Sequence, residues 1–170
     1  MCALEAFGPA AGASVQILAG DISSRALEKA RAATYPFTSI KMLAPDRLQR
    51  SFLRGTGSAE GLVRVAPEIQ TLVRFQRLNL IEPFNLGGPF DVIFCRNVAI
   101  YFEPETQSTV FNRLKSMLAP GGYLFVGHSE SMLSSGQAMD FVRPSVYRNG
   151  KSWPEVTSKT ILNGGYYEQR

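Results

Sequence analysis

The segment that decides the fold runs from Phe90 to Phe102 and reads FDVIFCRNVAIYF. Its first part, Asp91 to Cys95, is an apolar run that predicts a fully buried strand. Arg96 and Asn97 end that strand abruptly, and a Glu-Pro pair then opens a helix. Ligands of open parallel sheets bind just beyond the carboxyl ends of the strands. These polar residues are therefore candidate site residues, although an ordinary solvated loop would have the same composition.

The bulk composition is that of one globular domain. The chain has 170 residues, of which 45% are hydrophobic and 19% are charged, a length that can bury a sizeable core. No apolar run approaches the roughly 20 residues of a membrane-spanning helix. The N-terminus carries Glu5 and has no basic region, so we expect neither membrane insertion nor a signal peptide. The net charge is only +4 and the basic residues are scattered, so no nucleic-acid partner is expected.

The cysteines and the single histidine exclude other classes of site. Cys2 and Cys95 are predicted to be free thiols of a cytoplasmic protein. One His and two Cys are too few for a His- or Cys-rich metal centre, so no metal is expected. No G-x-G-x-x-G follows a strand, which argues against a nicotinamide-binding domain.

Strands and helices alternate along most of the chain. Residues 15–20 are predicted to form a strand and residues 25–33 a helix that Ser23 or Ser24 caps, after a loop up to Ser14. Residues 37–72 break this rhythm, because two short strands flank a Gly-rich link there. The pattern predicts an antiparallel hairpin within a small inserted β-subdomain.

The alternation then resumes. A strand at 73–78 is followed by the buried strand, by an amphipathic helix that starts at Pro104, and by a strand at 123–127. Residues 141–148 are predicted to form a closing antiparallel pair, and residues 149–170 a loosely ordered tail. This order predicts an α/β fold with a mostly parallel, doubly wound sheet over residues 1–148.

Polar residues end three successive strands of this predicted sheet. Asp21 can accept hydrogen bonds from ribose hydroxyls, although it can also cap the following helix. Asn79 and the backbone of Leu80 can pair with an adenine edge, although Asn also commonly ends a strand. With Arg96 and Tyr101 at the next strand end, these residues predict one site for an adenosine-bearing ligand. His128, in Gly-His-Ser-Glu, is better explained by a structural role in its loop than by acid-base chemistry.

Several of these segments together resemble the CheR family of chemotaxis receptor methyltransferases. They are LAGDIS at 18–23, FxRLNL at 75–80, FDVIFCRNVAIYF, LAPGGYLFVGHSES from Leu118, and RPSVYR at 143–148. The resemblance implies a class I methyltransferase fold, with a Rossmann-like sheet, that transfers a methyl group from S-adenosylmethionine to receptor glutamates. The expected partners are the cytoplasmic domains of chemotaxis receptors, and a monomer is expected.

The resemblance also implies roles for residues at matching positions. Asp21 would bind the ribose, and Asn79 and Leu80 would contact adenine. Arg96 and Asn97 would contact the cofactor, and Arg96 and Tyr101 would line the reaction centre. Two structural alternatives remain open: an ion pair of Arg96 with Asp91 or Glu103, and simple core packing of Tyr101. The insertion at about 37–72 would dock on the receptor.

The family pattern has parts that this sequence lacks. An N-terminal helical domain and a first strand with a GCSTGEE-like cofactor loop precede the matched segment in the family, so we expect the first strand of the sheet to be missing here. Gly20 also replaces the Thr that the family has before the ribose Asp. The alternative function is therefore a truncated, non-catalytic module that binds receptors.

Overall fold

The protein is described by a computed structural model that covers residues 1–8, 11–127, 139–150, 160–162 and 165–167. Its contacts divide the chain into two compact units, Met1–Asn79 and Leu80–Arg170. Each unit is described by itself below. The boundary predicted between 148 and 149 stays a prediction.

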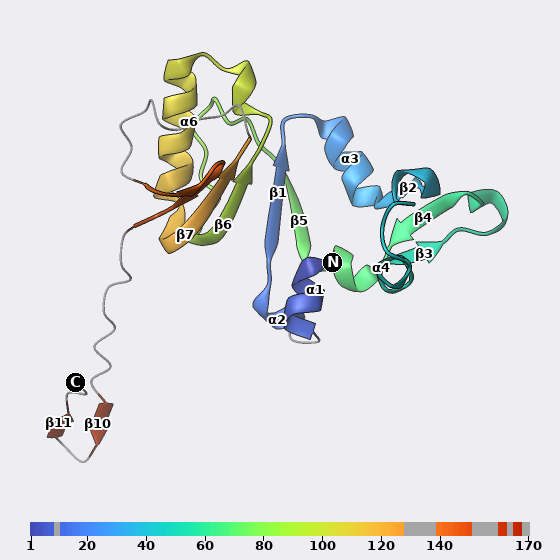
Figure 1. The fold of residues 1–170 in the computed structure, drawn as a ribbon, viewed down its shortest axis with the longest axis horizontal. Coiled ribbons are helices and arrows are strands. Elements are labelled where there is room, and N and C mark those ends of the chain that lie inside the picture. The colour runs from blue at the N-terminus through green and yellow to red at the C-terminus, as the bar shows by residue number, and fades with distance from the viewer. Residues whose placement is uncertain (9–10, 128–138, 151–159, 163–164, 168–170) are drawn as a thin grey trace. The chain divides into compact units, whose positions relative to one another are not determined.

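The first unit contains a short parallel sheet with one helix beside it. Strands β1 (Ile17–Asp21) and β5 (Val73–Arg77) pair in parallel, with Asp21 opposite Arg77, so both strands end at the same edge. Helix α3 (Ser24–Ala32) follows β1 (Figure 1) and begins, as predicted, at an N-cap serine. The hydroxyl of Ser23 accepts a hydrogen bond from the Ala26 amide at 3.2 Å. The helix buries Leu27 and thereby covers the small sheet.

Two short helices precede β1. Helix α1 (Cys2–Phe7) is followed by Gly8 at φ 56°, a conformation that favours glycine after a helix. The predicted loop up to Ser14 is wrong in part, because Ala11–Ser14 forms the helical turn α2. Alanine has a high helix propensity, so such a turn can form even where the sequence has no amphipathic pattern. Arg47 joins α1 to the inserted lobe through an ion pair with Glu5 at 2.6 Å.

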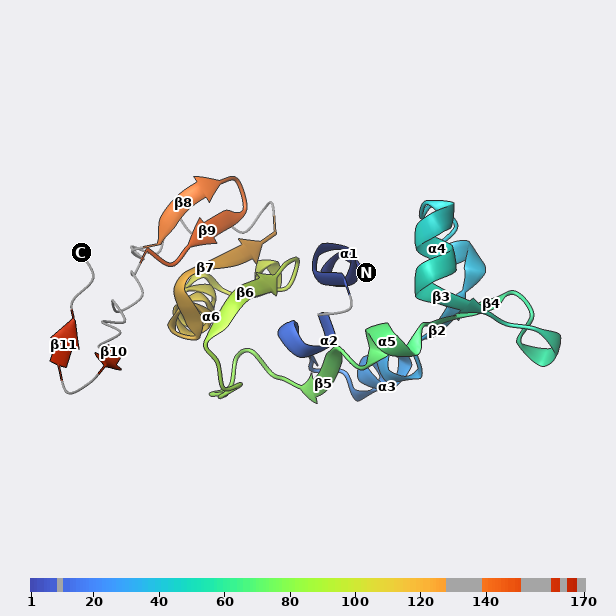
Figure 2. The ribbon, with the colours of Figure 1, turned by 90° about the horizontal axis from the view of Figure 1, so that it is seen from below.

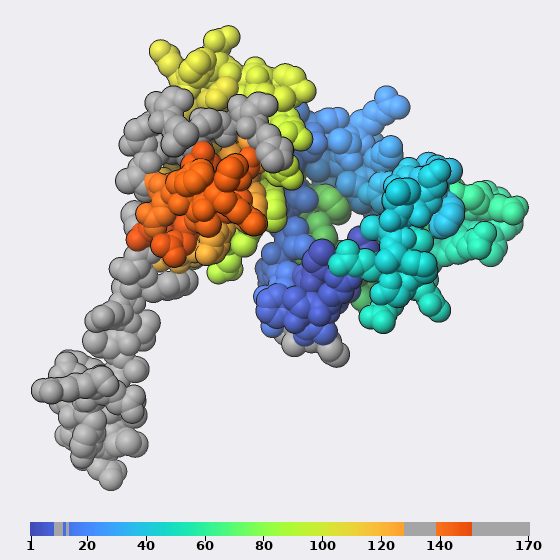
Figure 3. All heavy atoms as spheres, in the orientation of Figure 1, coloured from blue at the N-terminus to red at the C-terminus, as the bar shows by residue number. Residues whose placement is uncertain are grey.

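The insertion forms a separate small β-lobe, as predicted. Strands β3 (Phe52–Arg54) and β4 (Leu62–Val65) form the expected antiparallel hairpin. A third strand, β2 (Thr34–Pro36), pairs with the other side of β4. It was not predicted, because proline is uncommon within strands. Proline is tolerated at this sheet edge. Figure 3 shows the lobe, in cyan to green, projecting from the rest of its unit.

Short helices complete the lobe and its connections. They are α4 (Pro45–Ser51), α5 (Pro67–Gln70) and the 3-10 turns η2 (Phe37–Ser39) and η3 (Gly57–Ala59). Both α4 and α5 begin with proline, whose fixed φ suits the first helical position.

The second unit is a four-stranded sheet with a helix on one face. The strands are β6 (Phe90–Cys95), β7 (Leu118–Val126), β8 (Asp140–Arg143) and β9 (Val146–Arg148), in the order β6-β7-β9-β8. Strands β6 and β7 are parallel, and β8 and β9 form the predicted antiparallel edge pair. Helix α6 (Pro104–Ser116) starts at the predicted proline and lies on one side of β6 and β7 (Figure 2).

One face of this sheet carries the hydrophobic core. Val110, Phe111 and Leu114 of α6 pack with Leu124 and Val126 of β7. The predicted full burial of β6 is wrong in this structure. The side chain of Phe94 is 70% exposed even though its ring stacks on Phe125 at 4.7 Å. The reason is geometric: alternate residues of β6 point to opposite faces, and α6 covers only one of them.

The first half of β7 packs closely against β6 and against Asn149, the residue that follows β9. A Cβ atom at Gly122 would lie 3.0 Å from backbone oxygens of Phe90, Asp91 and Ala119, so any other residue there would have to displace backbone atoms. Asn149 is buried just after β9, and its backbone exchanges hydrogen bonds with Gly121 and Gly122 at 2.8 Å. The predicted tail therefore begins with a residue of the folded unit.

The described part of the tail contains one further pair of strands. β10 (Thr160–Leu162) and β11 (Gly165–Tyr167) are antiparallel, which differs from the predicted lack of regular structure. The sequence between them, Asn163-Gly164, is typical of tight turns, which the composition argument overlooked. In the described residues no helix has the length and apolar character needed to cross a membrane.

Candidate functional site

Asp21 lies at the carboxyl end of β1 and is exposed. It does not cap α3, because Ser23 does, so the capping alternative for Asp21 is wrong. Its Oδ1 instead accepts a hydrogen bond from the Ser23 amide at 2.8 Å, which fixes the orientation of the carboxylate. The second carboxylate oxygen has no hydrogen bond to a described residue. An exposed, oriented acceptor of this kind suits the hydroxyl of a sugar.

Two residues contact the chain on either side of Asp21: Arg77, which ends β5, and Leu78, which follows it. Leu78 packs on Gly20 so closely that a Cβ atom there would lie 2.8 Å from Leu78 Cδ2 and 3.0 Å from Leu78 Cβ. Arg77 donates from Nε to the carbonyl of Ile22 at 3.2 Å. Asn79, half-buried, follows β5 at the same edge of the sheet as Asp21. Asp21 and Asn79 therefore stand at the ends of two paired parallel strands.

The second unit presents its candidate residues directly after β6. Arg96 and Asn97 are both exposed, and Asn97 has φ 59°, a left-handed conformation that asparagine tolerates well. Tyr101 ends the 3-10 turn η4 (Ala99–Tyr101), and its side chain is 81% exposed. Core packing of Tyr101 is therefore excluded.

Arg96 also lacks the structural partners that were considered for it. The ion pairs among the described residues are Arg47–Glu5 and Arg148–Asp140, so neither Asp91 nor Glu103 pairs with Arg96. Arg148 differs: it donates a hydrogen bond to the Asp140 carboxylate, and this bond, together with the negative charge of Asp140, raises the pKa of the Arg148 guanidinium. Arg96 thus offers a guanidinium to a ligand without first breaking an ion pair.

The candidate residues fall into two groups, one in each unit. Asp21 and Asn79 belong to the first unit, and Leu80, Arg96, Asn97 and Tyr101 to the second. That all of them surround one cleft stays a prediction. His128, Ser129 and Glu130 lie outside the described residues.

Sequence analysis did not find Arg113, which holds the loop that carries Leu80. Its Nη1 donates to the carbonyl of Leu80 at 3.2 Å and to that of Glu82 at 2.5 Å. Its guanidinium carbon also lies 5.1 Å from the centre of the Phe84 ring. No local sequence pattern predicts these contacts, because they join residues that are 31 and 33 positions apart in the chain.

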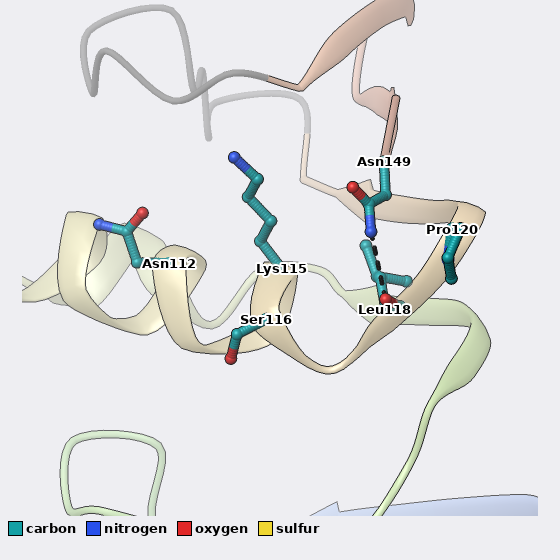
Figure 4. A pocket seen from close by; sticks show the side chains of 6 residues that line it. All are labelled: Asn112, Lys115, Ser116, Leu118, Pro120 and Asn149. Carbon is teal, nitrogen blue, oxygen red and sulfur yellow. Dashed lines mark hydrogen bonds between the residues drawn. The ribbon is translucent and has the colours of Figure 1, made fainter. Parts of the chain in front are cut away.

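A pocket of about 460 Å³ lies at the opposite end of β7 from Arg96 (Figure 4). Its lining residues are Asn112, Lys115, Ser116, Leu118, Pro120 and Asn149. Asn149 donates from Nδ2 to the carbonyls of Leu118 and Ala119 at 3.1 Å each. Its Oδ1 is buried and has no hydrogen-bond partner among the residues that the structure describes. This pocket lies at the amino end of β7, whereas Arg96 and Asn97 of the same unit follow the carboxyl end of the neighbouring parallel strand β6.

Comparison with known proteins identifies the family. Residues 1–148 match the model of the CheR methyltransferase, SAM binding domain. This chain belongs to the CheR methyltransferase family. The family's SAM-binding domain has S-adenosylmethionine as its cofactor, and the α/β class predicted from the sequence is confirmed.

Several curated relatives are similar to this CheR-family chain, and each is named chemotaxis protein methyltransferase. The relative from Salmonella typhimurium is 44% identical over 137 residues, covering 80% of this chain and 48% of the relative. The Klebsiella aerogenes relative is 50% identical over 128 residues, 75% of this chain and 44% of the relative. The Escherichia coli relative is 49% identical over 117 residues, 68% of this chain and 41% of the relative. The chain thus spans about half the length of the curated relatives it matches.

Proposed function

We propose that this chain carries the adenosine-binding and reaction-centre residues of an S-adenosylmethionine-dependent protein-glutamate O-methyltransferase that acts on chemotaxis receptors. The match of residues 1–148 to the family's SAM-binding domain is the observation that carries the proposal. The relatives' names support a methyltransferase over a non-catalytic receptor-binding module. When bound, S-adenosylmethionine supplies a methyl group on a positively charged sulfur.

Asp21 and Asn79 would hold the adenosine part of the cofactor. The carboxylate of Asp21 is fixed through Oδ1 by the Ser23 amide, and its second oxygen is available to a ribose hydroxyl. Asn79 follows the neighbouring parallel strand, and its side-chain amide can both donate to and accept from an adenine edge. Leu80, the next residue, would contact the same base. The donor and acceptor types of these residues fit a nucleoside.

Arg96, Asn97 and Tyr101 would form the reaction end. Arg96 is exposed and has no ion pair with a described residue, so its planar fork can orient a substrate carboxylate through two hydrogen bonds. Asn97 would contact the cofactor from the same loop. Tyr101 can donate a hydrogen bond from its exposed hydroxyl or form a wall beside the transferred methyl group.

Transfer to glutamate needs no general base in this chain. A glutamate side chain has an ordinary pKa near 4.3 and is already ionised at neutral pH. The contribution of the protein is to align the attacking oxygen with the methyl group and to exclude water. A site of exposed Arg and Tyr without a paired His and carboxylate is therefore chemically sufficient.

The β-lobe at about 37–72 would dock on the receptor cytoplasmic domain, which locates the reaction in the cytoplasm. Its exposed cations suit an acidic partner segment; they are Lys41, Arg50, Arg54 and Arg64. Arg54 also lies over the ring of Phe37 at 6.0 Å, which presents an aromatic and a cation together. We expect the chain to act as a monomer.

The test is transfer of labelled methyl from S-adenosylmethionine to a receptor cytoplasmic domain. We compare the 170-residue chain alone with a fusion in which the preceding segment of the Salmonella relative is placed before it. We expect the fused segment to supply contacts to the methionine carboxylate and ammonium of the cofactor, each worth about 1.5–3 kcal/mol. The fusion should therefore bind the cofactor about two to four orders of magnitude more tightly than the 170-residue chain. A fusion that binds cofactor but methylates no receptor glutamate would refute the proposed reaction.

A further inference from the structure

The loop that follows β5 is held to α6 by one arginine. Arg113 donates from Nη1 to the carbonyls of Leu80 and Glu82, at 3.2 and 2.5 Å. The same guanidinium lies 5.1 Å from the centre of the Phe84 ring, within cation–π range. Phe84 itself packs against the hydrophobic core beneath α6. Arg113 is partly buried, so these hydrogen bonds are less screened by water than those of an exposed arginine.

These contacts fix the direction of the loop backbone. Residues 80–84 belong to no helix or strand, so no regular ladder of hydrogen bonds orients their peptide groups. Because a peptide group is planar, fixing the carbonyl of Leu80 also fixes the direction of the Ile81 amide. The hydrogen bond at Glu82 fixes a second peptide group two residues further on.

We propose that Arg113 is the positioning residue for adenine recognition: by donating hydrogen bonds to the carbonyls of Leu80 and Glu82, it holds the loop so that the Leu80 N–H, and not the Leu80 carbonyl, faces the base. The inference rests on the proposed function, which assigns Leu80 to adenine. Arg113 does not touch the ligand in this account. It acts through the loop, and its distance along the chain explains why no motif includes it.

Other side chains would not replace this arginine. The two carbonyls belong to different peptide groups, and a planar guanidinium can donate to both while its face rests on Phe84. Lysine keeps the charge and a nitrogen donor but lacks the flat guanidinium face that lies over Phe84. Methionine keeps the apolar length of the stem and removes every donor. Arg113→Lys should therefore keep part of the effect and Arg113→Met none.

The experiment uses the fusion that carries the preceding segment of the Salmonella relative, with Arg113 unchanged as the wild-type form, and its Arg113→Met and Arg113→Lys variants. Lys115→Met is the matched control, because it removes a positive charge from the same helix. Hydrogen exchange is measured at the amides of Ile81, Glu82 and Phe84. Calorimetry measures the affinities for S-adenosylhomocysteine and for S-inosylhomocysteine, which differ only on the base edge.

The wild-type fusion should prefer the adenine compound, and Arg113→Met should lower that preference about tenfold, the equivalent of one hydrogen bond near 1.4 kcal/mol. Exchange at the three amides should become about tenfold faster. Arg113→Lys should fall between the two, and Lys115→Met should match the wild type. An arginine that only stabilised the fold would lower both affinities equally and leave the preference unchanged.

Each other result overturns a distinct statement. If Arg113→Met keeps the preference for adenine, the inference is wrong while the proposed function stands. If exchange at the loop amides is unchanged in Arg113→Met, the grip on the loop is wrong. If the wild-type fusion binds neither compound, the proposed function fails and the role in adenine recognition fails with it, even where exchange reports the hydrogen bonds of Arg113.

Discussion

The two ends of the β6–β7 sheet use their polar side chains in opposite ways. At the amino end of β7, Asn149 is buried, and its side-chain amide donates hydrogen bonds to the carbonyls of Leu118 and Ala119. At the carboxyl end of β6, Arg96 is exposed and has no ion pair with a described residue. The first end stabilises the fold. The second leaves donors available to a ligand, as parallel sheets generally do at their carboxyl ends.

Arg96 gives the sharpest test of this contrast. In the fusion that carries the preceding segment of the Salmonella relative, Arg96→Met should lower labelled methyl transfer about 10- to 100-fold. The physical reason is the loss of charge-assisted hydrogen bonds to a carboxylate. The melting temperature should stay within a degree or two, because an exposed side chain without partners contributes little to stability.

Arg74→Met is the control for Arg96. Arg74 is an exposed arginine in the middle of β5 and takes no part in the proposed site. Its removal should leave transfer unchanged. A fall in transfer as large as that of Arg96→Met would mean that overall charge, and not the position at the strand end, matters.

Asn149 tests the other end of the sheet. Asn149→Ala removes two donors from the buried carbonyls of Leu118 and Ala119 and should lower the free energy of unfolding by about 2 kcal/mol. Urea denaturation of the 170-residue chain measures it. Asn112→Ala, at an exposed position of α6, should change that free energy by less than about 0.5 kcal/mol. An Asn149→Ala protein as stable as the wild type would remove the structural role given to this end.

The elements with strong local signals were predicted closely. Helix α6 begins at the expected proline and buries one face, and β3 and β4 form the antiparallel hairpin expected within residues 37–72. The N-cap serine of α3 was found for the same reason, since a cap is a local interaction. The predicted strand-end positions of Asp21 and Arg96 also hold, because each directly ends or follows a strand.

What the sequence did not predict depends on contacts between distant residues. An apolar strand such as β6 does not reveal which of its faces a helix covers, so the exposure of Phe94 was missed. Strand β2 exists because β4 pairs with it, not because of its own sequence. Arg113 reaches carbonyls 31 and 33 residues away, which no motif describes. Geometry was also needed to exclude the cap for Asp21 and the ion pair for Arg96.

Substitution of Tyr101 should have the smallest effect on methyl transfer, and it tests what this side chain does at the carboxyl end of the sheet. Its side chain is 81% exposed, so Tyr101→Phe should leave the melting temperature unchanged. If the hydroxyl donates one neutral hydrogen bond in the reaction centre, transfer by the fusion should fall about 3- to 10-fold, the equivalent of roughly 0.7–1.4 kcal/mol. If instead the ring only forms a wall beside the methyl group, Tyr101→Phe should transfer at the wild-type rate while Tyr101→Ala should not. Full activity in both variants would remove Tyr101 from the site and leave Arg96 as the reaction-end residue that the strand-end argument identifies.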